Sequence, residues 1–163
     1  KLLQAFDLFK AKSQSDIKLV IVGDKMYGTS QMLQALNEMI FKKDVVFTGR
    51  MQVEKLKLVV GSALAMTYVS YFEGFGIPLL EAMMCDIPIV ASNCTSIPEV
   101  AGDAAIYVDP YSIDSISDGM LRIYNDKELR NQLVINARQQ REKFSWDKSA
   151  QILYNCMMMS VDK

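Results

Sequence analysis

The sequence predicts an α/β protein with a parallel sheet covered by helices on both faces, and three observations support this prediction. Short apolar runs rich in β-branched residues alternate with segments of helical periodicity. Several of these runs end in glycine or in an aspartate-proline pair. Half of the 163 residues are hydrophobic, so one sizeable core can form without disulfides or metal. We therefore expect one doubly wound, Rossmann-like three-layer αβα domain over residues 1–163.

Five apolar runs have the length and composition of buried parallel strands. They lie at residues 17–23, 45–49, 63–69, 87–91 and 104–108. Pro88 marks the N-terminal end of the fourth strand, because proline cannot donate a hydrogen bond in a strand interior.

Helical periodicity fills the segments between and after these runs. The expected helices cover residues 1–9, 30–41, 53–60, 77–84, 113–124, 127–143 and 145–159, with one helical turn at 98–101. The first helix is already under way at Lys1, which suggests a chain cut from a longer protein and a sheet without its first strand. Trp146 is expected to pack and to anchor the last helix, and Met157, Met158 and Met159 are expected to make core contacts near a loose terminus.

The composition excludes several classes of chemistry. Histidine is absent, so these residues hold no Ser-His-Asp or Cys-His machinery, and no metal site is expected. The net charge is -1 with both signs interspersed, so no overall field would attract nucleic acid. Cys85, Cys94 and Cys156 lack CxxC or zinc-type spacing, and we expect buried or free thiols in a reducing compartment. No apolar run approaches the roughly 20 residues that span a bilayer, and no signal peptide is expected from the first residues.

The loop from Ser70 to Pro78 has the most unusual composition of the strand-to-helix loops. Ligands of open parallel sheets bind beyond the carboxyl ends of the strands, where such loops gather. Gly74 and Gly76 flank Phe75 and let the backbone approach a ligand, while Pro78 suits the first turn of the next helix. The free N–H groups and the dipole of that helix N-terminus favour a phosphate or diphosphate.

Two glutamates lie on either side of this helix start. Glu73 precedes the glycines and Glu81 lies about one turn past Pro78, so the carboxylates are expected on the order of 10 Å apart. One carboxylate could accept hydrogen bonds from a ribose and the other from a hexose, with the diphosphate between them. Composition and spacing alone leave a second interpretation equally open, in which the glycines serve packing and the glutamates are a cap and a solvated face.

The segment from Glu73 to Glu81 is similar to the E-x7-E signature, in its EGFGxPxxEA form, of the family 4 (group 1) retaining glycosyltransferases of the GT-B fold. Flanking segments resemble the same family. They are residues 45–56 (VxFxGxVxxEEL), 87–93 (G-x-PVVASN) and 97–105 (PEVxGDAA), followed by Val108-Asp109-Pro110, Leu129-Arg130 and Phe144-Ser145-Trp146. The resemblance covers essentially the whole chain.

The resemblance implies the C-terminal, nucleotide-sugar-binding domain of a GT-B transferase. The residues that it implies for the site are Glu73 as the catalytic group, with Gly49, Arg50, Gly74, Phe75, Gly76, Leu80 and Glu81 as substrate-binding groups. Glu73 and the backbone of residues 74–76 would contact the donor sugar and its phosphates, and Glu81 the ribose. Gly49 and Arg50 would border the nucleobase, and the side chain of Leu80 would pack beneath the nucleotide.

The resemblance also implies retention at the anomeric carbon without a metal or another cofactor, the leaving diphosphate being stabilised by basic side chains and helix dipoles. The Arg and Lys that clamp the diphosphate in the family fall upstream of Lys1, which is not assigned to that role. Asp86 stands where the family usually has glycine, and Val69 where proline often precedes the serine.

The leading hypothesis is a donor domain that binds GDP-mannose or a UDP-hexose. With an N-terminal acceptor domain absent here, it would transfer the sugar to a glycan, lipid or polysaccharide, as in the bacterial polysaccharide mannosyltransferases that the motifs resemble. The isolated chain is expected to be inactive.

The alternatives are a GT-B sugar-nucleotide epimerase or phosphorylase and a nucleotide-binding module without catalysis. A dehydrogenase is disfavoured because residues 22–25 lack a GxGxxG turn. The expected location is the cytoplasm, and a peripheral position at the inner face of the membrane stays open for the full-length protein.

Overall fold

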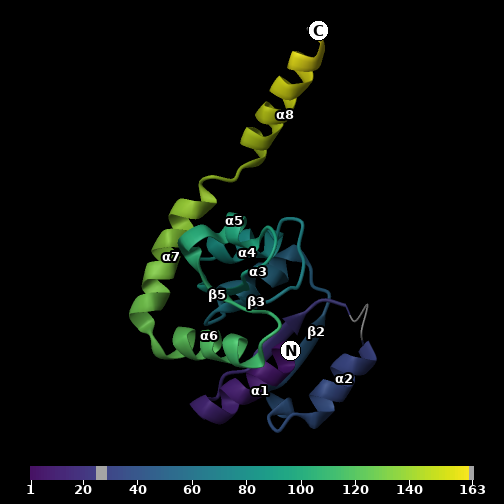
Figure 1. Ribbon diagram of the computed structural model, residues 1–163, viewed down its shortest axis with the longest axis vertical. Helices are drawn as coiled ribbons and strands as arrows, with labels where there is room; N and C mark the ends of the chain where they lie inside the picture. Colours follow the sequence, from purple (N-terminus) through teal and green to yellow (C-terminus); the bar gives the residue numbers. More distant parts are fainter. Residues whose placement is uncertain (25–28, 162–163) are drawn as a thin grey trace.

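Strands and helices alternate through most of the computed structural model, which describes residues 1–24 and 29–161 (Figure 1). The strands are β1 (Leu19–Val22), β2 (Val45–Gly49), β3 (Met66–Tyr68), β4 (Ile89–Ser92) and β5 (Ala105–Val108). The helices are α1 (Leu2–Ser13), α2 (Thr29–Glu38), α3 (Val53–Gly61), α4 (Ile77–Met84), α5 (Ile97–Ala101), α6 (Ile113–Asn125), α7 (Lys127–Arg141) and α8 (Trp146–Val161). Short 3-10 helices, η1 (Lys42–Asp44) and η2 (Gly102–Ala104), directly precede β2 and β5.

The strands pair in parallel, which confirms the predicted fold class. β1 pairs with β2, and a separate three-stranded sheet has the order β3-β4-β5. All four residues of β4 are buried, as expected for a central parallel strand with helices on both faces. The described strands therefore form two sheets, where the sequence predicted one.

A cavity of about 790 Å³ explains this division. It is lined by residues 19–22 of β1 and 66–68 of β3, together with apolar side chains of α1 and α3. Paired strands lie about 4.8 Å apart, so two strand edges that face a common cavity are too distant to share a ladder of hydrogen bonds. No strand among the described residues lies between β1 and β3, and the expected additional first strand stays a prediction.

The core divides between the two faces of β4. Val90 packs in a cluster with the apolar side of α1 and of α6. Ile89 and Ala91 point to the opposite face and pack with buried side chains of α4 and α5. This alternation follows from the period of two along a strand, and it confirms the predicted layers of helix, sheet and helix.

Several element boundaries differ from the prediction for local reasons. The strand predicted at 63–69 is confined to Met66–Tyr68, because the Ala63 N–H donates to the Val60 carbonyl and closes a turn after α3. The helix predicted at 30–41 ends at Glu38, since the Asp7 carboxylate accepts hydrogen bonds from the N–H groups of Ile40 and Phe41. A side chain from α1 thus replaces the helical acceptors of α2.

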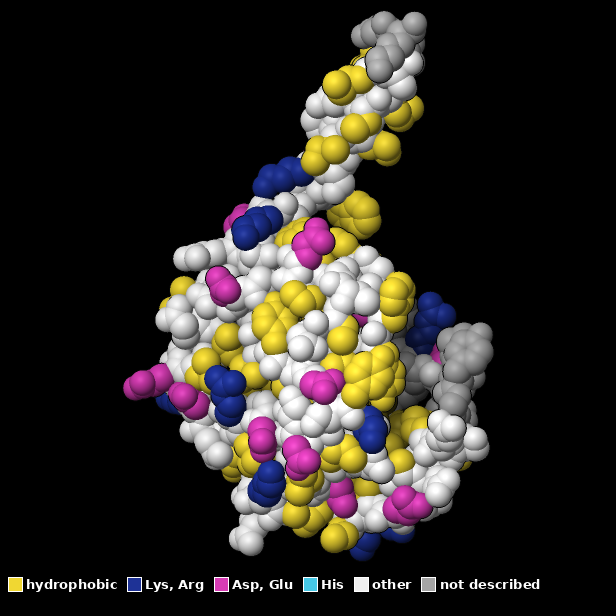
Figure 2. All heavy atoms as spheres, in the orientation of Figure 1, with side chains coloured by type: hydrophobic (Ala, Val, Ile, Leu, Met, Phe, Trp, Pro, Cys, Tyr) yellow, Lys and Arg dark blue, Asp and Glu magenta, His cyan; other side chains and the backbone are white. Residues whose placement is uncertain are grey.

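Helix α8 extends away from the rest of the molecule (Figure 1). The prediction that Trp146 packs is wrong, because its side chain is 87% exposed. The expected core contacts of Met157, Met158 and Met159 are also wrong, since these residues are 43–71% exposed. Figure 2 shows apolar side chains spread over this projecting helix. Within the described part of the chain, no helix is both long and apolar enough to cross a membrane.

Gly119 in α6 provides a test of the packing between helix and sheet. A Cβ atom at this position would lie 2.6 Å from Cγ1 of Val108 and 3.0 Å from Cγ1 of Val90. Gly119→Ala is expected to lower the free energy of unfolding by about 1–3 kcal/mol, because overpacking outweighs the higher helix propensity of alanine. Urea denaturation measures this difference. Gly61→Ala is the matched control, since a Cβ there meets no atom within 4 Å, and it should be neutral or stabilising. Wild-type stability of Gly119→Ala would contradict the packing.

Asp86 joins the end of α4 to α7 by hydrogen bonds from arginine. Its carboxylate accepts from Arg138 Nη2 at 2.6 Å and Nε at 3.0 Å, and from Arg141 Nη1 at 3.2 Å. The hydrogen bond from Arg138 is the main reason why the pKa of Asp86 is lowered. Because the folded-state pKa is depressed, the stabilisation is present above the unfolded pKa of about 3.9 and is lost as pH falls through the folded value.

Asp86→Asn tests this linkage while keeping a residue that tolerates the local φ of 56°. At pH 7 the substitution should lower Tm by no more than about 4 °C, because the ion pair is exposed to solvent. The difference from wild type should shrink as the pH is taken below about 4. Thermal unfolding at pH 7 and pH 3 measures it, and a difference independent of pH would show that charge is not the cause.

Candidate functional site

The loop after β3 brings together most of the predicted site residues. This loop, residues 70–76, leads from the carboxyl end of β3 to the start of α4, and it carries Glu73, Gly74, Phe75 and Gly76. Gly76 has φ 102°, a conformation that residues with a side chain rarely adopt. A Cβ atom there would also lie 3.1 Å from Leu79 Cδ1. Both the conformation and the space therefore call for glycine at the entry to α4.

The N-terminus of α4 has no side-chain cap. Gly76 is its N-cap and has no side chain, so no capping side chain occupies the helix start. Pro78 lies in the first turn, as predicted, where its missing N–H costs nothing. The remaining free N–H groups and the helix dipole favour negative charge at this point.

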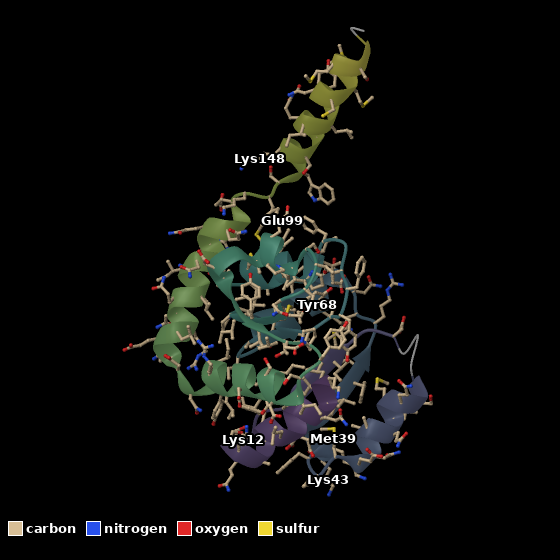
Figure 3. The ribbon with its side chains drawn as sticks, in the orientation of Figure 1. Lys12, Met39, Lys43, Tyr68, Glu99 and Lys148 are labelled. Atoms are coloured by element: carbon tan, nitrogen blue, oxygen red, sulfur yellow. The ribbon has the colours of Figure 1, made fainter. Side chains whose placement is uncertain are left out.

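Tyr68, the last residue of β3, is influenced by both predicted carboxylates. Burial is the largest cause that raises the pKa of Tyr68 to about 12, followed by the hydrogen bond to the Glu73 side chain. The charge of Glu81 adds to the same shift, and a side-chain hydrogen bond from Ser70 opposes it. The phenol therefore stays protonated at physiological pH, with the Glu73 carboxylate as a neighbour. Figure 3 labels Tyr68 in the middle of the molecule.

Sequence reasoning missed Tyr68 as a site residue. It was treated as one apolar residue in a predicted strand, whereas its hydroxyl lies where the strand ends and loop 70–76 begins. The available signal was a tyrosine, and not a purely apolar residue, at the end of a strand that leads into a glycine-rich loop.

Glu81 and Leu80 lie on α4 beyond its first turn. Glu81 borders the cavity of about 790 Å³, together with Pro78 and Tyr68. Leu80 is partly buried and packs against the core cluster around Leu79. The volume of this cavity is in the range of small-molecule sites, and Glu81 is a carboxylate at its wall.

Gly49 and Arg50 form a second group, because they belong to the end of β2 in the other sheet. Gly49 has φ 69°, and its carbonyl accepts a hydrogen bond from the Gly23 N–H at 3.0 Å, which ties β2 to the end of β1. The side chain of Arg50 is exposed. No hydrogen bond within residues 1–24 and 29–161 joins these two residues to loop 70–76. Lys25, the last position of the segment that lacks a GxGxxG turn, lies outside the described residues.

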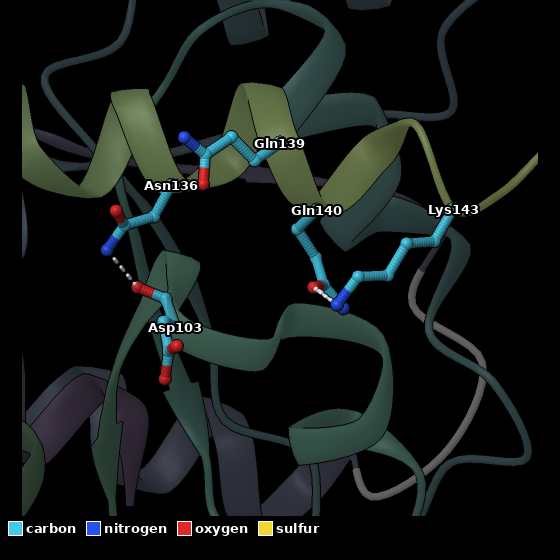
Figure 4. Close-up of a pocket in the computed structure, with 5 residues that line it drawn as sticks. All are labelled: Asp103, Asn136, Gln139, Gln140 and Lys143. Atoms are coloured by element: carbon cyan, nitrogen blue, oxygen red, sulfur yellow. Dashed lines mark hydrogen bonds between the residues drawn. The ribbon is translucent and has the colours of Figure 1, made fainter.

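A smaller hollow of about 140 Å³ lies between η2 and α7 (Figure 4). Asn136 Nδ2 donates to the Asp103 carbonyl at 2.8 Å, and Lys143 Nζ donates to Gln140 Oε1 at 2.7 Å. The Gln140 side chain also donates to two backbone carbonyls of α5. These hydrogen bonds pair polar groups around the hollow with one another, and they fix α7 to η2 and α5.

Metal-binding side chains do not gather in the described part of the chain, where no group of three or more His, Cys, Asp or Glu could hold an ion. The predicted absence of a metal cofactor stays a prediction. The three cysteines are free thiols, of which Cys85 and Cys94 are partly buried and Cys156 is exposed.

Comparison with known proteins identifies relatives over most of the chain. The model of the family "Glycosyl transferases group 1" matches residues 1–140. O-antigen chain mannosyltransferase B of Escherichia coli is 33% identical over 146 residues, which are 90% of this chain and 38% of that protein. The serotype-specific mannosyltransferase WbdA of Escherichia coli is 28% identical over 153 residues, which are 93% of this chain and 19% of that protein. The chain thus spans less than half the length of these relatives.

Solved structures show the same fold. Sucrose-phosphate synthase from Thermosynechococcus elongatus has a TM-score of 0.80 at 21% identity, over 97% of this chain and 42% of its own. HepE from Anabaena, in complex with UDP and glucose, has a TM-score of 0.82 at 18% identity, over 96% of this chain and 44% of its own. These likenesses confirm the Rossmann-like domain of GT-B enzymes as the fold. With the family match over residues 1–140, they show that the chain belongs to the group 1 glycosyl transferases.

Proposed function

We propose that this chain is the donor-binding part of a hexosyltransferase, which takes its sugar from a nucleoside diphosphate sugar. The observation that carries the proposal is the uncapped N-terminus of α4 at Gly76, between the carboxylates of Glu73 and Glu81. An anion site flanked by two groups that bind hydroxyls fits a diphosphate with a sugar at each end.

The diphosphate would bind at the turn from loop 70–76 into α4. Backbone N–H groups at a helix N-terminus donate to phosphate oxygens, and they are already oriented before the ligand arrives. The same dipole stabilises the negative charge that develops on the leaving diphosphate, so the proposed chemistry uses no metal ion. Basic side chains from the rest of the protein would add to this stabilisation.

Glu81 would accept hydrogen bonds from the ribose hydroxyls, since it borders the large cavity on α4. Leu80 would support the nucleotide from beneath through its contact with the core. Gly49 and Arg50 would border the nucleobase from the end of β2. They belong to the sheet of β1 and β2, whereas loop 70–76 follows β3 in the other sheet.

Glu73 would bind the donor sugar beside the bond that breaks. Tyr68 lies beside its carboxylate and would help to orient it. An ionised carboxylate at this point stabilises positive charge that develops on the sugar ring in the transition state. Retention of the anomeric configuration is part of the proposal.

The donor is proposed to be GDP-mannose, because the relatives of highest similarity named above are mannosyltransferases. A UDP-hexose is the competing donor, and the structural likeness to HepE bound to UDP supports it. A glycan or lipid-linked glycan is the proposed acceptor, which would bind to a part of the protein outside this chain. The cytoplasmic location stays a prediction.

A second candidate applies to the chain by itself, a nucleotide-binding module without catalysis. The uncapped start of α4 and the cavity beside Glu81 would account for such binding. Titration calorimetry with UDP, GDP and ADP tests both candidates. The wild-type chain should bind one of these nucleotides weakly, and no binding at millimolar concentration to the chain or to the full-length protein would contradict both.

Substitution of the two glutamates separates their proposed roles. Glu81→Gln should weaken binding of the nucleoside diphosphate about ten- to hundredfold, because it removes charged hydrogen bonds to hydroxyl groups. Glu73→Gln should change this affinity little, but in the full-length protein it should lower kcat about hundredfold or more, because the lost charge acts in the transition state. Calorimetry and steady-state release of the nucleoside diphosphate measure the two effects.

Glu99→Gln is the matched control for these substitutions. Glu99 is exposed on α5, and no hydrogen bond among the described residues joins its side chain to loop 70–76, so both affinity and kcat should keep their wild-type values. Wild-type kinetics in both Glu73→Gln and Glu81→Gln would contradict the assigned roles.

A further inference from the structure

We propose that Thr95 and Ser96 are positioning residues of the donor site. They belong to the segment 92–96, which leads from β4 into α5 and lies against loop 70–76. Their hydroxyl groups set the backbone of this loop, and through it they place the Glu73 carboxylate and the N–H groups of Gly74 and Gly76. The inference rests on the proposed function and adds residues that do not contact the donor.

Ser96 holds two carbonyls of the loop with one hydroxyl. Its Oγ lies 2.9 Å from the Glu73 carbonyl oxygen and 3.1 Å from the Phe75 carbonyl oxygen. A hydroxyl has a single proton, so this is a shared hydrogen bond. It draws the two carbonyls to the same side of the loop, on either side of Gly74.

Because the peptide bond is planar, the contact with Ser96 also fixes the direction of two backbone N–H groups. The described peptide bonds are all trans, so each N–H points opposite to the carbonyl of the same peptide unit. The N–H of Gly74 shares a unit with the Glu73 carbonyl, and the N–H of Gly76 shares one with the Phe75 carbonyl. Because both carbonyls face Ser96, both N–H groups face away from Ser96. Two backbone donors are thereby aimed to the same side, as an anion site requires.

Thr95 fixes the amide of the catalytic residue itself. Its Oγ1 accepts the hydrogen bond from the Glu73 N–H at 3.1 Å. Thr95 has φ 51°, a left-handed conformation that is a rare outlier for a β-branched residue. Such outliers persist where the surrounding structure holds them, and they concentrate at functional sites. Strain in the backbone therefore coincides with the contact that holds Glu73.

The segment 92–96 is itself anchored in the core. Ser92 is fully buried at the end of β4, and its Oγ donates to the Ser70 carbonyl at 2.7 Å, where the loop begins. The Asn93 N–H donates to the Val108 carbonyl of β5 at 3.1 Å. Because β4 is buried along its length, a rigid element supports the hydroxyl groups that set the loop.

Hydrogen exchange of the Glu73 amide tests the Thr95 contact in the chain without any assay of activity. Thr95→Ala removes the only described acceptor of this amide, so its exchange should become up to about tenfold faster, whereas Thr95→Ser keeps a hydroxyl and should stay near the wild-type rate. Equal exchange in Thr95→Ala and wild type would overturn the role of Thr95.

Kinetics of the full-length protein tests the consequence for the reaction. Ser96→Ala should lower kcat for release of nucleoside diphosphate from a nucleotide sugar about ten- to hundredfold, because a shift of about 1 Å in a reacting group has effects of this size. KM should rise by a smaller factor, and Ser96→Thr should restore most of kcat.

Asp126→Ala is the control for a purely structural effect. It removes the hydrogen bond from the Leu129 N–H to Asp126 at the start of α7, so it should lower Tm and leave kcat unchanged.

Wild-type kcat in Ser96→Ala, with a wild-type enzyme that binds and turns over its donor, would overturn this inference alone. A wild-type protein that binds no nucleoside diphosphate would overturn the proposed function and the inference with it. If Ser96→Ala does not fold, the amide exchange in Thr95→Ala decides.

Discussion

The candidate site depends on how the backbone turns from β3 into α4 at Gly76. The left-handed φ of this residue ends the loop, and the absence of a side chain leaves the helix N-terminus uncapped. The ring of Tyr68 and the side chain of Leu79 lie against the turn, so a larger residue would meet atoms as well as an unfavourable conformation. Glu73 and Glu81 are placed by this single turn, one before it and one after it.

The buried strand β4 gives this turn its support. Its two faces pack in different clusters, so it cannot shift without disturbing both halves of the core. From its end come the hydroxyl groups of Ser92, Thr95 and Ser96, all of which bond to the backbone of loop 70–76. The segment 92–96 therefore connects loop 70–76 to the core. The conformation of the loop is set by these contacts, and not only by the residues proposed to touch the donor.

Local patterns predicted the parts of the fold that depend on near neighbours. Helix 77–84 was predicted with its observed bounds, because glycine and proline mark its start in the sequence. The positive φ of Asp86 also accounts for the glycine that the family pattern has at this place. By contrast, the division into two sheets depends on what lies between β1 and β3, and the exposure of Trp146 depends on which surface α8 meets. The spacing of apolar residues predicts neither the division into two sheets nor the exposure of Trp146.

In the candidate site, too, local patterns predicted some residues and missed those whose contacts join distant parts of the chain. Spacing alone brought out a glycine-rich turn with two acids, and only the family resemblance gave Glu73 and Glu81 separate roles. Tyr68, Thr95 and Ser96 were missed because hydroxyl groups have no periodic pattern. The contacts of Thr95 and Ser96 also join residues more than twenty positions apart.

The central claim is that a nucleoside diphosphate binds at the start of α4, and amide chemical shifts report this most directly. Titration of the ¹⁵N-labelled chain with UDP and with GDP should shift the amide signals of Gly74, Gly76 and Ile77 more than any others, because bound phosphate polarises these N–H groups. Shifts that leave these three signals unchanged and gather elsewhere, such as in the hollow between η2 and α7, would contradict the account.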